Sequence, residues 1–217
     1  MPLNFLRRKK APAAVAVPTP VAPTGLRVMR AGVAFDAVTE DWRLTGRMDV
    51  EGRLSDALNK REAVAIHDVQ WSPIDGSGPL VEAPGLKSVD PYDLILVLAG
   101  EGSMPELTDI ERAAHRVHKV SYDVALEVPP FRVLGTVFMH PGSEPDRLLD
   151  RATEMFVPVV EAVATYGDVR VGDPDVETVL VNRFYLRGVE QIDKRTGIKA
   201  QRLPGAPLGG TTWQDRS

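Results

Sequence analysis

The chain has 217 residues and no cysteine, with 43% hydrophobic and 26% charged residues. This globular composition excludes a fully disordered chain, and the missing cysteine excludes disulfides, thiolate nucleophiles and cysteine-ligated metals. No stretch approaches the roughly 18 apolar residues of a membrane-spanning helix. The net charge of −4 divides into an acidic body and two basic tails: residues 31–193 carry 15 basic and 29 acidic residues, whereas residues 1–30 and 194–217 carry net charges of +6 and +4. An acidic body repels phosphate backbones, which argues against nucleic-acid binding.

Residues 1–30 are predicted to form a disordered, basic and proline-rich tail. Proline recurs too often in residues 11–24 for a helix. Before this segment, apolar residues precede a basic cluster, which is the reverse of a secretory signal and indicates a cytoplasmic protein. The cluster is either a weak peripheral contact with an anionic membrane at the inner face or a solvated tail. The residues of this candidate membrane contact are Phe5, Leu6, Arg7, Arg8, Lys9 and Lys10.

Four sequence patterns occur twice in the same order, 89 to 94 residues apart. The first of them is an aromatic–Arg–aliphatic–x–Gly pattern that ends at Gly46 and again at Gly135. The paired segments are 42–46 with 131–135, 53–56 with 147–150, 63–69 with 156–162, and 89–94 with 181–186. The common order and spacing predict an internal duplication.

Each predicted repeat contains four or five strands and one short helix. Residues 42–50 alternate apolar and polar side chains, as a half-buried strand does. In residues 53–59 the apolar side chains recur at helical spacing, and a second helix is expected at 146–153 with Leu149 facing inward. The aromatic residues expected in the core of these strands are Phe35, Trp42, Phe131, Phe138 and Phe184. The expected strands are 33–38, 42–50, 63–71 and 94–98 in the first repeat, and 122–128, 131–139, 156–165 and 184–189 in the second.

These elements predict a mainly β protein made of two tandem small antiparallel β-barrel-like units, packed against each other as a pseudo-dimer. A short antiparallel sheet has to curl to bury one face, and a unit of this size holds little core alone. The predicted organisation is a basic tail (1–30), a first repeat (31–100), a connector helix (101–119), a second repeat (120–193) and a second disordered basic tail (194–217).

The repeat resembles a short, uncharacterised bacterial domain of unknown function. The residues that carry the resemblance are the Arg-Leu-Ser-Asp-Ala-Leu-Asn run at 53–59 and the Val-Asn-Arg-Phe-Tyr-Leu run at 181–186. The second repeat departs from it by carrying Leu149 and Ala152 where the first has Ser55 and Leu58. The resemblance implies a fold and no activity.

Arg147 and Arg151 have a spacing that would place two guanidinium groups one helical turn apart, where they could clamp a phosphate. The alternative is a pair of solvated residues neutralised by Asp146 and Asp150. Cyclic-dinucleotide receptors with such a clamp also carry an Asp/Asn-x-Ser-x-x-Gly strand motif. The motif is incomplete here, because residues 75–80 end in Leu80 where the motif has glycine.

No cofactor, catalytic residue or metal site is predicted. Asp173, Asp175 and Glu177 alternate and could meet a hard cation, but they lack the frame of a calcium loop and are interpreted as an acidic turn. The serines lack a placed base and the glycine-rich stretches lack a phosphate-loop lysine. Trp213, in the C-terminal tail, is a candidate residue for partner docking.

The sequence therefore favours a non-enzymatic protein-binding or scaffold module with an unidentified partner. The alternative function is a sensor of a small anionic, nucleotide-type ligand that binds in the cleft between the repeats.

Overall fold

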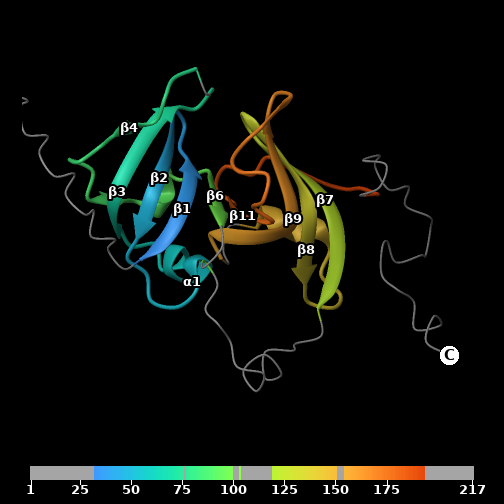
Figure 1. Cartoon of the computed structure of the whole chain (residues 1–217). Helices are drawn as coiled ribbons and strands as arrows, with labels where there is room; N and C mark the ends of the chain where they lie inside the picture. Colours follow the sequence, from blue (N-terminus) through green and yellow to red (C-terminus); the bar gives the residue numbers. More distant parts are fainter. Residues whose placement is uncertain (1–31, 76, 100–102, 104–118, 151–153, 194–217) are drawn as a thin grey trace, which may run out of the picture.

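The computed structural model describes residues 32–75, 77–99, 103, 119–150 and 154–193 (Figure 1). The two predicted tails and the predicted connector helix therefore lie outside the described residues, apart from Ser103 and Lys119 at the edges of the connector. Below, residues 32–99 are called the first half and residues 119–193 the second half.

The described residues are mainly β. The elements of the first half are β1 (Val33–Val38), β2 (Trp42–Met48), α1 (Leu54–Asn59), β3 (Val64–Pro73), β4 (Val81–Glu82), β5 (Ser88–Val89), the 3-10 helix η1 (Pro91–Asp93) and β6 (Leu96–Ala99). Those of the second half are β7 (Val120–Val128), β8 (Phe131–Met139), the 3-10 helix η2 (Pro145–Leu149), β9 (Phe156–Tyr166), β10 (Val169–Arg170), β11 (Thr178–Asn182) and β12 (Gly188–Gln191).

The strands form one antiparallel sheet that is not closed. Ten strands follow the order β12-β7-β8-β9-β11-β6-β1-β2-β3-β4, while β10 pairs with β9 and β5 pairs with β3. The expected arrangement of two barrel-like units is not confirmed, because the strands of both halves belong to one continuous open sheet. The continuity comes from β6 and β11, which pair with each other and lie between the two groups of strands (Figure 1). Two strands that would otherwise be edges thus satisfy each other's backbone groups.

The predicted helix of the first half is confirmed. α1 buries Leu54, Ala57 and Leu58, which share one face at helical spacing. The predicted α-helix at 146–153 is wrong: η2 is a 3-10 helix, and the chain is extended at Asp150. Leu148 is buried, but Leu149 is 42% exposed rather than inward. Within the described part of the predicted helix, residues 146–150, Leu148 is the one buried residue, and this part has no apolar stripe that would stabilise a longer helix.

The aromatic residues divide between core and surface. Phe35 and Phe131 are buried, as expected from the strand pattern. Trp42 and Phe138 are 41% and 51% exposed, so their expected place in the core is wrong. Trp42 begins β2 and its ring meets the ring of Trp71 edge-on, at 4.3 Å between centroids, which shelters part of both rings outside the core.

The same β-bulge occurs in both halves. The register of β2 against β3 shifts at Gly46, and that of β8 against β9 shifts at Gly135. Across from these glycines, Asp68 and Glu161 both have positive φ angles, of 53° and 48°. The bulge brings backbone close to each glycine: a Cβ atom at Gly46 would lie 3.0 Å from the carbonyl oxygen of His67. Both positions therefore require glycine for close approach.

Asn182 joins the two halves from a fully buried position. Its side-chain amide donates to the backbone oxygens of Leu94, at 2.7 Å, and Pro91, at 3.3 Å, and accepts from the backbone N–H of Phe184, at 3.0 Å. These bonds hold the turn before β6 against the end of β11, which is where the groove described next is built.

Candidate functional site

A groove of about 440 Å³ opens beside β5 and the turn between β1 and β2. Its apolar side chains include Leu44 and Val89, which are buried and belong to the core of the first half. Tyr185, from the second half, also lines it. The full lining is Thr39, Glu40, Asp41, Trp42, Leu44, Leu86, Ser88, Val89, Asp90, Asp93 and Tyr185.

Four carboxylates and no basic side chain line this groove. Glu40 and Asp41 come from the β1–β2 turn. Asp90 caps the start of η1 and Asp93 is its last residue. All four are exposed. The pKa of the Tyr185 hydroxyl is raised, first by burial and then by the negative charges of Glu40 and Asp93. Ionisation of the Tyr185 hydroxyl is therefore disfavoured, and the negative electrostatic field of these carboxylates favours a bound cation.

Local hydrogen bonds position the acidic side chains. In the β1–β2 turn, the N–H of Thr39 donates to the oxygen of Trp42 at 2.8 Å, and the N–H of Trp42 donates to the Thr39 hydroxyl at 3.1 Å. The turn thus closes on itself and leaves Glu40 and Asp41 at its exposed tip. At the other wall, the carboxylate of Asp90 accepts from the N–H of Tyr92 at 2.9 Å, as an N-cap residue does.

Aromatic side chains complete the walls. The hydroxyl of Tyr185 donates to the backbone oxygen of Tyr92 at 3.1 Å, which fixes its ring at the boundary between the halves. Tyr92 in turn packs against Phe184 at 5.4 Å between ring centroids. Trp42, which is 41% exposed, also lines the groove. The site therefore combines negative charge with flat apolar surface.

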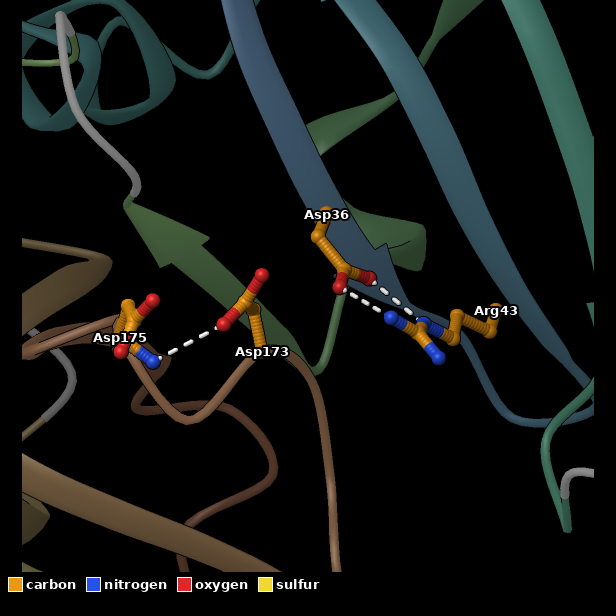
Figure 2. A network of polar contacts seen from close by, with 4 residues as sticks. All are labelled: Asp36, Arg43, Asp173 and Asp175. Carbon is orange, nitrogen blue, oxygen red and sulfur yellow. Dashed lines mark hydrogen bonds and ion pairs between the residues drawn. The ribbon is translucent and has the colours of Figure 1, made fainter.

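A separate polar contact lies where the acidic turn of the second half approaches β1 and β2 (Figure 2). The guanidinium of Arg43 donates to both carboxylate oxygens of Asp36, at 2.9 and 2.6 Å. That hydrogen bonding raises the pKa of Arg43, and the charge of Asp173 adds to the shift. Asp173 itself accepts from the N–H of Asp175 at 2.9 Å, so the predicted acidic turn is present.

No group of three or more His, Asp or Glu side chains among the described residues could hold a metal ion. In the same part of the chain, no helix is long and apolar enough to cross a membrane.

Of the sequence-predicted site residues, the structure describes Arg147 alone. Arg147 is exposed on η2, and Arg151 lies outside the described residues. The 3-10 helix η2 ends at Leu149, before Arg151, and the clamp formed by Arg147 and Arg151 stays a prediction. The membrane-contact residues Phe5, Leu6, Arg7, Arg8, Lys9 and Lys10, and Trp213, also lie outside the described residues.

The sequence-based reasoning missed the groove. Its residues lie in three segments of the sequence, which are 39–44, 86–93 and the lone Tyr185. The signals in the sequence that could have indicated it are two pairs of carboxylates, in the Thr-Glu-Asp-Trp turn and in the Asp-Pro-Tyr-Asp cap. No family model matches the chain, and neither curated proteins nor solved structures match it. The resemblance of residues 53–59 and 181–186 to a domain of unknown function stays a prediction.

Proposed function

We propose that the chain is a protein-binding module that acts by binding rather than by catalysis, and that its groove takes a cationic, partly apolar segment of a partner protein. The observation that carries this proposal is the combination of four carboxylates with an apolar floor and two aromatic side chains in one groove. Aromatic anchors supply contact area, and complementary charge selects and steers the partner.

The acidic lining supports this function over the sensing of an anionic ligand. A nucleotide-type ligand would bring its phosphates against Glu40, Asp41, Asp90 and Asp93, where like charges repel. A lysine- or arginine-rich segment would meet the same carboxylates favourably and could stack on Trp42. Trp213 remains a second candidate for contact with a partner.

The proposal includes a tandem arrangement of two related β units, 31–100 and 120–193. The shared bulge supports it, and so does the strand order, which is β6-β1-β2-β3 in the first half and β12-β7-β8-β9 in the second. The pairing agrees in register as well: Leu96 lies opposite Val38, and Gly188, 92 residues later, lies opposite Glu127. Duplication would explain why one half supplies a binding groove while the other supports it.

Binding of a basic peptide tests the groove. A synthetic peptide that alternates lysine and leucine should bind in low salt and bind less well as salt is added, because exposed charges are screened. The Glu40→Gln/Asp41→Asn variant should bind it about tenfold more weakly, since each exposed ion pair contributes up to roughly 1 kcal/mol. Isothermal titration calorimetry measures both effects.

The matched control is Asp146→Asn/Asp168→Asn, which removes the same charge from exposed positions outside the groove lining. This variant should retain most of the affinity. Equal weakening in the two variants would show that the peptide responds to net charge alone, and the groove would lose its assigned role.

We further propose a cytoplasmic location and a weak membrane contact through residues 1–10. Phe5 and Leu6 beside four basic residues support it, although one such cluster binds an anionic surface only marginally. The chain should co-sediment with anionic but not neutral liposomes at low salt, and Phe5→Ala/Leu6→Ala should abolish this binding. Failure to bind either liposome at low salt would leave the segment as a solubilising tail.

A further inference from the structure

We infer that the groove is a strand-docking site, in which an extended basic segment of a partner protein adds to the outer edge of β5 as an antiparallel strand. This inference rests on the proposed function and specifies how the partner binds. It comes from a comparison of the two halves, because the second half already contains such a strand at the corresponding place.

The correspondence between β5 and β11 follows from their registers. Val89 of β5 pairs with Val64 of β3. In the second half, Val181 of β11 pairs with Val157 of β9. These positions are 92 and 93 residues apart, so β5 and the end of β11 occupy the same place beside corresponding strands. The cap is shared too, since the side chain of Asp90 accepts from the N–H two residues ahead, as that of Asn182 does.

β6, from the first half, pairs with the outer edge of β11 in the second half. The corresponding edge in the first half is that of β5. Leu96, Val97 and Ala99 of β6 pair with Val181, Leu180 and Thr178 of β11. The residues that correspond to these three β11 positions are Val89, Ser88 and Leu86, and all three line the groove. The groove thus lies where the counterpart of β6 would be, and within the described residues β5 pairs with β3 alone.

The backbone of β5 is oriented for such an addition. The carbonyl oxygen of Lys87 accepts from the N–H of Ile66 on β3, at 2.9 Å. Because successive residues of an antiparallel strand direct their N–H and C=O groups to opposite sides, Ser88 directs its own groups away from β3. A docked residue opposite Ser88 would exchange two hydrogen bonds with it, in the manner of peptides that extend an exposed sheet edge.

The chemistry of the occupant differs from that of β6. The residues that correspond to Glu40 and Asp41 in the second half are Pro129 and Pro130, so the second half has no acidic tip at this place. Alternate side chains of β6, Leu96 and Leu98, enter the core of the second half. A segment that suits β5 therefore has apolar residues at alternate positions, as β6 does, and lysine or arginine residues around them.

A second copy of the chain is the rival occupant. β12 corresponds to β6, and its addition to β5 of another molecule would set Glu190 opposite Lys87 in the register of β6 and β11. That contact would join two different strands, β12 of one copy and β5 of the other. It would also bring together two bodies that each carry a net charge of −14 over residues 31–193, with 15 basic and 29 acidic residues. Charge complementarity therefore favours a basic partner.

The test uses an octapeptide, Lys-Lys-Leu-Val-Leu-Ala-Lys-Lys, which carries the four residues of β6 between lysines. In the β6 register its valine lies opposite Ser88. N-methylation of this valine removes the N–H that pairs with Ser88 and should weaken binding to the full chain at least about tenfold. N-methylation of the next leucine, whose N–H points away from β5, is the matched control and should change affinity by less than about threefold.

Protein variants supply the complementary measurement. Ser88→Pro removes the edge-facing N–H, which an edge strand tolerates, and should reduce peptide binding as strongly as valine N-methylation does. Ser88→Ala keeps the N–H and should bind like the unchanged chain. If Ser88→Pro lowers the melting temperature, the N-methylated peptides decide the question on the unaltered protein.

The outcomes separate the inference from the proposed function. Tight binding that is insensitive to the position of the N-methyl group would overturn strand addition and leave the acidic groove as a binding site. If the lysine peptide binds no better than a version with glutamate in place of lysine, the proposed function fails. Self-association lost in Ser88→Pro would assign the edge to a second copy instead. Stronger peptide binding after removal of residues 1–31 or 194–217 would assign it to the chain's own tail.

Discussion

Replacement of Asn182 by alanine should lower the free energy of unfolding by about 2–4 kcal/mol, as measured by urea denaturation. The side chain is fully buried and makes three hydrogen bonds to backbone groups, two to carbonyl oxygens before β6 and one to the N–H of Phe184. Each bond contributes roughly 1 kcal/mol net, and the groups left without a partner in a dry interior add a desolvation cost. Because these bonds hold the turn that carries Asp93, peptide binding should weaken as well.

Asp90 provides the control for this prediction. It occupies the corresponding position in the first half and makes the corresponding bond to Tyr92, but it is exposed to solvent. Asp90→Ala should therefore cost only about 0.5–1 kcal/mol, as the loss of an exposed helix cap does. Equal losses of stability in the two variants would mean that Asn182 acts only as a local cap and does not join the halves.

Replacement of Gly135 by alanine should destabilise the chain by about 2–3 kcal/mol. A Cβ atom there would lie 2.6 Å from the Cγ1 atom of Val159 and 2.9 Å from the carbonyl oxygen of Val160. The second contact is to backbone inside the β8–β9 pairing, which cannot move without breaking the ladder, so the overpacking is not relieved by a change of rotamer. Thermal unfolding followed by circular dichroism would report the loss.

Two other glycines calibrate this effect. Gly46 lies at the same kind of bulge, but a Cβ atom there would lie 3.0 Å from its nearest neighbour, the carbonyl oxygen of His67. Gly46→Ala should therefore lower the free energy of unfolding by less than Gly135→Ala does. At Gly85 a Cβ atom would meet no atom within 4 Å, and Gly85→Ala should change stability by less than about 0.5 kcal/mol. If Gly135→Ala lowered the stability as little as Gly85→Ala, the claim that backbone lies too close to Gly135 for a Cβ atom would be wrong.

The edge of β5, which pairs with β3 alone within the described residues, is where we propose that a partner binds. An exposed edge is a risk of aggregation that proteins usually cover or charge. Here charge surrounds the edge, because Glu40, Asp41, Asp90 and Asp93 line the groove beside it. Carboxylates at this place would discourage pairing between acidic copies of the chain while leaving the edge accessible to a basic segment.

Local patterns in the sequence determined much of the secondary structure. Period-two alternation predicted β2, and the helical spacing of Leu54, Ala57 and Leu58 predicted α1. Both signals depend on which side of an element is buried, which neighbours in sequence record directly. The second predicted helix was wrong because apolar residues at helical spacing were taken to share a buried face. Of the described residues 146–150, Leu148 is buried and Leu149 is exposed.

Only the tertiary structure decided how the strands join and where the groove lies. Closure into barrels or continuity into one sheet depends on which strand pairs with the second edge of β6. Its first edge pairs with β1, in its own half, and its second edge pairs with β11. No local pattern predicts this partner, because the period-two alternation sets which face of a strand is buried and not which strand lies beside it. The groove depends on that choice, because pairing of β6 with β11 fills one edge and leaves its counterpart at β5 open. Its residues, from Glu40 to Tyr185, come together through contacts that are distant in sequence. The sequence by itself determined the acidic balance of the body, and the fold concentrated part of that charge at one open strand edge.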